Sequence, residues 1–229
     1  MTRAALAALV LGLLATTGPG CGAPPSDEPL PEEETPESER FRAPSSSTGY
    51  LVLEEGTLRF QPCGATVTQP VDDLSDGEAR RLVEDLGHGE DRIAAAVVLE
   101  GMRLLEVRHA AGEARTCEDL LPGVDLEARG NEPFWSLEVQ GEEARWRTPD
   151  ELDGIVWSEG EWRSTGEGRW QFEARRGGPG EEERLLLDLE SAPCRDTMAG
   201  FRFPYIARLD LAGIAYEGCA LEGHSSTRP

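Results

Sequence analysis

Residues 134–139, Phe-Trp-Ser-Leu-Glu-Val, decide the fold of the second half of this chain. The large apolar side chains Trp135, Leu137 and Val139 occupy every second position, so they point to one face of an extended strand. Residues 185–189, Leu-Leu-Leu-Asp-Leu, again place leucine at every second position. Such alternation in short segments predicts an antiparallel barrel or sandwich with one face exposed to water.

Further short apolar segments extend this pattern over residues 126–219. Glycine-rich separators, such as residues 166–168 and 177–180, mark turns between them. We expect strands at residues 134–139, 143–148, 154–157, 170–174, 185–189, 203–211 and 214–218.

The block before this one combines strands with a helix. Residues 49–64 predict two strands joined by a turn, and residues 92–109 predict two more. Ser75 and Glu78 have the S-x-x-E spacing of a capping box, which predicts a short helix ending at Leu86. Strand, strand, helix, strand, strand is compatible with a small OB-like barrel. The whole chain is therefore expected to be mainly β.

The first 20 residues have the composition of an export signal. Arg3 supplies a positive start, and residues 4–15 form an apolar stretch too short to span about 30 Å of hydrocarbon. Gly20 and Gly22 flank Cys21 as at bacterial lipoprotein processing sites. We predict cleavage before Cys21 and attachment of lipid, including palmitate, to this residue. Simple secretion is the alternative.

Cysteine arithmetic supports the lipid anchor. The chain has five cysteines, and lipidation of Cys21 leaves an even set of four. Four cysteines allow three pairings. We predict the disulfides Cys63–Cys117 and Cys194–Cys219, because each pair then lies within one compositional block. No C-x-x-C or C-x-x-H spacing is present, so we do not expect a zinc site or another metal.

Composition divides the chain into five segments. Residues 21–47 are rich in proline, glutamate and serine, and such a segment cannot bury enough apolar surface to offset its ordering entropy. We therefore expect a disordered acidic tether there. The predicted segments are a signal peptide at 1–20, the tether at 21–47, an OB-like domain at 48–122, a second barrel at 123–223 and a tail at 224–229.

Charge restricts the possible partners. The formal net charge is −22, from 44 acidic and 22 basic residues. The sequence has no cluster of cations that would bind a phosphate backbone or an anionic lipid surface, so we exclude nucleic acid as a partner. A chain of this charge would attract a basic protein over long distances. We expect no cofactor, and the sequence leaves the oligomeric state open.

Two segments of the second block resemble a known family. Gly130-Asn131-Glu132-Pro133-Phe134-Trp135 resembles the G-x-E-P-F-W signature of a family of bacterial envelope lipoproteins. Cys194-Arg195-Asp196-Thr197-Met198, followed by Pro204-Tyr205 and Gly218-Cys219-Ala220, resembles the C-terminal part of the same family. The resemblance implies a META-like β-barrel with its two cysteines bridged, and it implies no established activity.

A weaker resemblance concerns the first block. Residues 60–64, Phe-Gln-Pro-Cys-Gly, resemble part of the OB-type domain of an envelope-stress and copper-response lipoprotein. The metal-linked C-x-x-C motif of that protein is missing from this sequence. We therefore do not infer metal sensing.

The motif residues are candidates for a site, but we interpret them as structural. Pro133 biases Glu132 toward extended geometry just before a strand whose Trp135 is expected to plug the barrel. We expect Glu132 to be partly buried, accepting backbone hydrogen bonds or pairing with an arginine; a functional carboxylate is the alternative. Asp196, near Met198, is expected to accept backbone or arginine donors in a turn held by the disulfide.

The tryptophans are a second candidate set. Trp157 and Trp162 flank residues 158–161, Ser-Glu-Gly-Glu, which predict a turn, so both side chains could face a ligand such as a sugar. The alternative is that these tryptophans, with Trp146 and Trp170, fill the barrel core.

Catalytic motifs are absent from the sequence. His88, His109 and His224 are scattered, and there is no G-x-S-x-G or H-E-x-x-H segment. The acidic pairs at 142–143 and 150–151 are expected in solvated turns rather than in a glycosidase cleft. We therefore assign no catalytic residue and predict that the chain is not an enzyme.

The sequence thus predicts an exported, lipid-anchored protein of the bacterial cell envelope, at the outer membrane if the source is Gram-negative. We expect a non-enzymatic module that binds an envelope partner or supports stress tolerance. An inhibitor of a basic hydrolase such as lysozyme is the first alternative, and a hydrolase of envelope polymers is the second.

Overall fold

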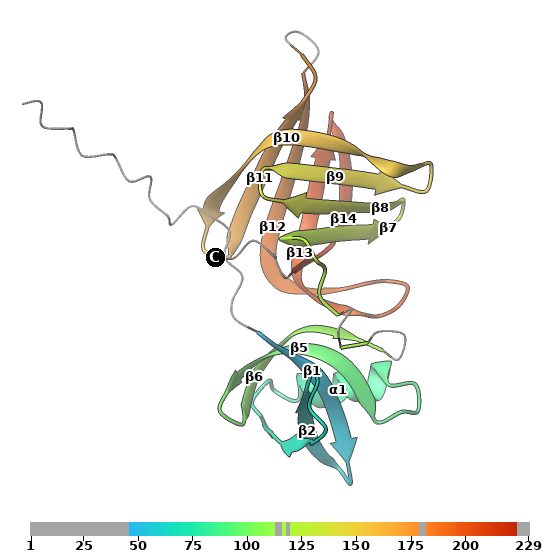
Figure 1. Ribbon diagram of the computed structural model, residues 1–229, viewed down its shortest axis with the longest axis vertical. Helices are drawn as coiled ribbons and strands as arrows, with labels where there is room; N and C mark the ends of the chain where they lie inside the picture. Colours follow the sequence, from blue (N-terminus) through green and yellow to red (C-terminus); the bar gives the residue numbers. More distant parts are fainter. Residues whose placement is uncertain (1–45, 113–115, 118–119, 179–181, 224–229) are drawn as a thin grey trace, which may run out of the picture. The chain divides into compact units, whose positions relative to one another are not determined.

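The computed structural model describes residues 46–112, 116–117, 120–178 and 182–223, all within one compact unit of the chain, residues 37–229 (Figure 1). The predicted signal peptide, Cys21, nearly all of the tether and the C-terminal tail lie outside the described residues. Within the described ranges, no helix has the length and apolar character needed to cross a membrane.

The described chain is mainly β with one short helix, as predicted (Figure 1). The first block contains β1 (Ser47–Glu54), β2 (Thr57–Pro62), β3 (Gln69–Pro70), β4 (Asp72–Asp73), α1 (Glu78–Leu86), β5 (Arg92–Glu100) and β6 (Arg103–Ala111). The second contains β7 (Leu126–Asn131), β8 (Phe134–Gln140), β9 (Glu143–Thr148), β10 (Glu151–Gly166), β11 (Arg169–Arg176), β12 (Glu183–Arg195), β13 (Arg202–Leu211) and β14 (Ile214–Glu222).

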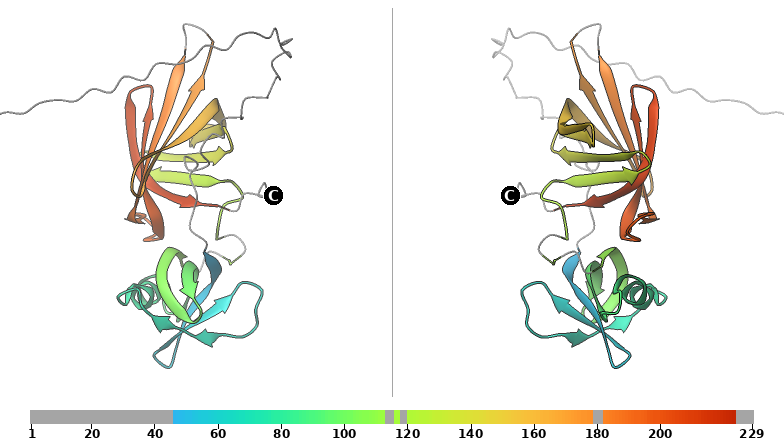
Figure 2. Two further views of the ribbon diagram at one scale, coloured as in Figure 1. Left: turned by 90° about the vertical axis from the view of Figure 1, so that its left-hand side faces the viewer. Right: turned by 90° about the vertical axis from the view of Figure 1, so that its right-hand side faces the viewer.

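Strands β7 to β14 form a closed antiparallel barrel. Each strand pairs with the next along the chain, and β14 pairs with β7 to complete the ring, which Figure 2 shows from two further sides. Closure gives every strand of this barrel two neighbours, so none presents a free edge to other chains. The expected barrel is confirmed.

The alternating side chains of the second block form the barrel core. Trp135, Leu137 and Val139 are buried on one face of β8, as the period-two pattern predicts. Leu185, Leu187 and Leu189 contribute in the same way from β12. The other buried members are Leu126, Ala128, Ala144, Trp157, Phe172, Ala174, Tyr205, Ala207, Leu209, Leu211 and Ala220.

The first block has a core of its own. β1 pairs with β2 and β5, and β5 pairs with β6, all antiparallel. β2 continues the sheet to β3, and β4 lies parallel to β6. Among the described strands no pairing joins β3 to β4, so the pairings of this block do not form a closed ring. One face of α1 packs into this core through Ala79, Leu82, Val83 and Leu86. One residue pair, Arg202 with Ala110, joins β13 to β6.

Both predicted disulfides are confirmed. Cys63 is bonded to Cys117, with a Cα–Cα distance of 5.7 Å, and Cys194 to Cys219, with a Cα–Cα distance of 5.6 Å. Each bond closes a loop within one of the two blocks, which restricts the unfolded chain and so stabilises the folded state.

Two strand predictions for the second block are wrong. β7 was not among the expected strands, and β10 covers residues 151–166 rather than 154–157. Glycine explains the second error, because Gly160 lies inside β10 and not in a turn. A Cβ at Gly160 would lie 2.1 Å from the ring of Phe172. Glycine here allows close packing rather than ending the strand.

The predicted short helix is present, but the predicted capping box is wrong, because the N-cap residue is Gly77 and it makes no side-chain capping bond. The helix begins at Glu78, and the hydroxyl of Ser75 accepts a hydrogen bond from the Ala79 N–H at 3.0 Å. The Ser75 N–H in turn donates to Asp73 Oδ1 at 3.0 Å. The Glu78 N–H donates to the backbone oxygen of Ser75 at 3.0 Å. The Glu78 carboxylate, which a capping box would bond to the Ser75 N–H, instead accepts a hydrogen bond from Arg202 of β13 at 2.9 Å.

Candidate functional site

The indole of Trp135 is enclosed where β7, β8 and β14 meet. Trp135 is 4% exposed, and its Nε1–H donates to the backbone oxygen of Glu217 at 3.3 Å. A Cβ at Gly130 would lie 2.2 Å from that nitrogen, and a Cβ at Gly218 would lie 2.9 Å from the indole carbon Cζ2. Both positions therefore have to be glycine for the indole to fit.

Asn131 brings the two motif segments together. Its side-chain Nδ2 donates to Asp196 Oδ2 at 3.0 Å and to Thr197 Oγ1 at 3.3 Å. In the β7–β8 register Asn131 lies opposite Phe134. The Cys194–Cys219 disulfide ties the end of β12, just before the loop at 196–201, to β14. Asn131 and Asp196, 65 residues apart in the sequence, thus share one outer region of the barrel.

Asp196 organises the turn of this loop. Its Oδ1 accepts hydrogen bonds from the N–H groups of Met198 at 2.8 Å and Ala199 at 2.6 Å. Burial opposes its ionisation, but the bonds from Ala199, Asn131 and Met198, with the charge of Arg129, hold its pKa below the ordinary value. The ionised carboxylate is used as a structural acceptor.

Other motif residues face solvent. Glu132 and Pro133 form the two-residue turn between β7 and β8, joined by a cis peptide bond. The expectation that Glu132 is partly buried is therefore wrong, because a tight turn projects its side chain outward. No hydrogen bond or ion pair of its carboxylate is found among the described residues. Phe134 and Met198 are 51% and 70% exposed.

Trp157 and Trp162 do not flank a turn, which corrects the sequence prediction. Residues 158–161 lie within β10 at a β-bulge, where Glu159 has a φ of 55°. Trp157 is 4% exposed and belongs to the barrel core, and Trp162 packs partly buried against Phe172. The core-filling alternative therefore describes their placement.

A buried polar network was missed by sequence reasoning. Arg108 of β6 donates from Nε to Glu222 Oε1 at 2.9 Å and from Nη2 to the hydroxyl of Tyr205 at 2.7 Å. The side chains of Arg108 and Glu222 are 4% and 6% exposed. Burial, reinforced by the charge of Glu222, raises the pKa of Tyr205 and keeps its hydroxyl protonated.

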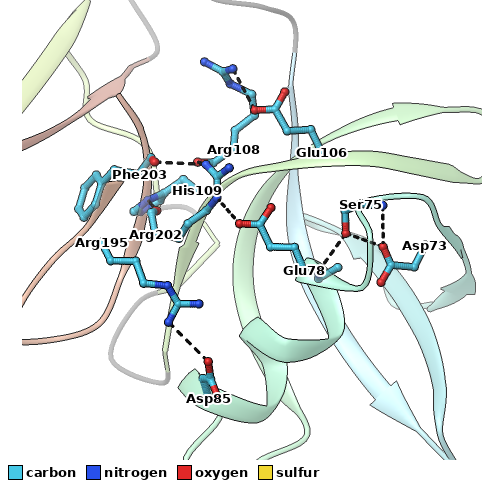
Figure 3. A network of polar contacts seen from close by, with 11 residues as sticks. Asp73, Ser75, Glu78, Asp85, Glu106, Arg108, His109, Arg195, Arg202 and Phe203 are labelled. Carbon is cyan, nitrogen blue, oxygen red and sulfur yellow. Dashed lines mark hydrogen bonds and ion pairs between the residues drawn. The ribbon is translucent and has the colours of Figure 1, made fainter. Parts of the chain in front are cut away.

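Arg202 continues this network (Figure 3). Its Nη1 donates to the backbone oxygens of Arg108 at 2.7 Å and Phe203 at 3.2 Å, and its Nε forms the bond to Glu78. His109 is 3% exposed, and its Nδ1 lies 2.5 Å from the backbone oxygen of Arg202. The network therefore connects β6, β13, β14 and α1. The charged residues of β6 alone, read in the sequence, did not indicate these distant partners.

The hydrogen-bond donors to Asp196 are Asn131, Met198 and Ala199, and none of them is a histidine. His109 is buried at β6, His88 is exposed after α1, and His224 lies outside the described residues. The described ranges also contain no group of three or more His, Cys, Asp or Glu side chains positioned to hold a metal ion.

A cleft of about 400 Å³ lies over β11, β12 and β13. Arg169 and Arg208 donate to the carboxylate of Glu190 at 3.3 Å and 3.2 Å. The bonds from Arg208 and Arg169 lower the pKa of Glu190. The charges around this cleft are therefore largely paired with one another. The full lining is Thr165, Arg169, Trp170, Asp188, Leu189, Glu190 and Arg208.

Comparison with known proteins gives no relative: no family model matches the chain, and neither a curated protein nor a solved structure matches it. The resemblances in the two motif segments therefore stay predictions.

Replacing Asp196 by asparagine is expected to lower the free energy of unfolding by about 1–2 kcal/mol at pH 7, because the amide bonds the turn N–H groups less strongly than a carboxylate. The folded-state pKa is depressed, so the stabilisation is present above the unfolded pKa of about 3.9 and is lost as the pH falls through the folded value. Urea unfolding of the wild type and the Asp196→Asn variant from pH 7 to pH 2 is the test. The difference between their free energies of unfolding should shrink as the pH falls.

Asp150→Asn is the matched control, because Asp150 is exposed and has no bonding partner among the described residues. Its free energy of unfolding should differ from that of the wild type by close to zero at every pH. An Asp196→Asn effect that is independent of pH would contradict the role given to the ionised carboxylate.

Replacing Glu222 by glutamine is expected to lower the free energy of unfolding by about 3 kcal/mol, because Arg108 then loses its buried counter-ion. Its remaining ion pair is with Glu106, a partly exposed carboxylate at 3.2 Å, which keeps the cost at the low end of the range for a broken buried pair. The control is Glu100→Gln, which removes the exposed partner of Arg103 and should cost less than about 1 kcal/mol. Denaturant unfolding of the two variants measures the contrast. Equal losses of unfolding free energy in the two variants would show that the buried Arg108–Glu222 pair stabilises the fold no more than an exposed ion pair does.

Proposed function

We propose that this chain is a lipid-anchored protein of the bacterial envelope that binds a protein partner and catalyses no reaction. The observation that supports binding over catalysis is the division of the motif residues. Asp196 and Asn131 bond within the protein, whereas Phe134 and Met198 expose apolar surface to solvent. Apolar and aromatic side chains that a fold leaves exposed are typical of the centres of protein interfaces.

Export is supported by the two disulfides as well as by the predicted signal peptide at residues 1–20. The two disulfides belong to an oxidising compartment, because cytosolic thiols are kept reduced. A bonded set of four cysteines also agrees with a separate role for Cys21 as the lipid acceptor. The META-like and OB-like relationships are part of the same proposal.

Inhibition of a basic hydrolase such as lysozyme is the second candidate. The net charge of −22 favours it, because it would speed the approach of a cationic enzyme. Hydrolysis of envelope polymers has weaker support. Asp196 is occupied by the side chain of Asn131 and the backbone N–H groups of Met198 and Ala199 rather than by a histidine.

The anchor is tested on the full-length protein expressed in a bacterial host. Mass spectrometry of the mature protein should show an N-terminal Cys21 with acyl mass, and the protein should sediment with membranes. The Cys21→Ser variant should lose the acyl mass and leave the membrane fraction. A wild-type protein that begins after Cys21, or that has no acyl mass, would disprove the anchor.

The inhibitor candidate is tested with lysozyme. Stoichiometric inhibition at 150 mM salt would support it, since screening there reduces exposed long-range attraction. Binding at low salt that vanishes near 150 mM would mean nonspecific attraction and would remove this candidate. A neutral protein of similar size is the control ligand.

A further inference from the structure

We propose that Glu132, Phe134, Met198 and Glu217 form a docking face for a basic protein. This inference rests on the proposed binding function and specifies where the partner binds and what chemistry it has. The four residues come from the β7–β8 turn, β8, the loop at 196–201 and β14.

Backbone and side-chain bonds place these segments next to one another. Asn131, directly before Glu132, bonds Asp196 and Thr197, and Thr197 directly precedes Met198. Phe134 lies opposite Asn131 in the strand register. The backbone oxygen of Glu217 in β14 accepts the indole hydrogen bond of Trp135 in β8, across the intervening strand β7.

The frame under the docking face is held in place before any partner arrives. The Asp196 turn, the Cys194–Cys219 disulfide and the buried Trp135 fix the three segments from below. A surface that is already ordered loses little entropy on binding, so more of the contact energy is available for affinity. Exposed Phe134 supplies a flat apolar contact, and Met198 can adapt to the shape opposite it.

The unpaired charge on the docking face is negative. Glu132 and Glu217 are exposed, and neither carboxylate has an ion pair or hydrogen bond among the described residues. Neighbouring cations are already occupied: Arg129 pairs with Glu127 at 2.9 Å, and Arg208 with Glu190 at 3.2 Å. With the whole chain at −22, this arrangement is complementary to an apolar contact surrounded by Lys or Arg.

The test is photo-crosslinking of the full-length anchored protein in envelopes of its own host. Benzoylphenylalanine replaces Phe134 in one variant and Met198 in another. Val67 and Leu152 are matched control positions, because they are apolar and 65% and 76% exposed but lie elsewhere. We expect both docking-face variants to capture the same protein, at least about tenfold more than the controls, with a net positive charge by mass spectrometry. Adding Glu132→Gln and Glu217→Gln should lower the yield severalfold.

Each other outcome has a distinct meaning. Capture at position 67 or 152 alone would overturn the docking face and leave the binding function intact. No adduct at any of the four positions would count against both. An acidic captured protein, including a second copy of this chain, would overturn the basic partner, and so would a yield unchanged by the two glutamine substitutions.

Discussion

The pairing of β14 with β7 is the contact on which the second barrel depends, because it converts a meander of eight strands into a closed ring. It requires Gly130 and Gly218, since a Cβ at either position would collide with neighbouring atoms. The space left by the missing side chains is filled by the indole of Trp135. Closure of the ring and enclosure of the tryptophan are thus one event, and neither is possible with larger residues at these two positions.

The outer side of the same strands is determined by this closure. Residues alternate between core and exterior, so Gly130 in the interior places Asn131 outside, and Ala220 in the interior places Cys219 outside. Asn131 and Cys219 then hold the loop at 196–201, through Asp196 and through the disulfide with Cys194. A single register therefore sets both the inner packing and the outer loop.

Sequence reasoning succeeded where the signal was local. Alternating leucines in β12 predicted a barrel strand, and the division of the chain into two compositional blocks predicted both disulfides. It failed where a residue has a partner that local pattern does not show. Glycine in β10 was taken to mark a turn because its distant neighbour, Phe172, is invisible in the local pattern. Likewise Arg108 looks like a solvent-facing charge until Glu222, 114 residues later, is placed beside it.

The buried network and the exposed motif residues are two departures from the rule that apolar side chains are buried and charged ones are exposed. Two arginines and a glutamate are buried between strands, which is costly unless each charge finds a partner, and their mutual bonds make one arrangement of β6 against β13 and β14 far better than others. Phe134 and Met198, in contrast, are apolar residues on a surface where nothing in the described fold covers them. Both depart from the simple rule of apolar inside and polar outside. The first departure is compensated within the protein by Glu222, Tyr205 and Glu78. The second has no internal compensation, and the proposed docking face accounts for it through contact with a partner.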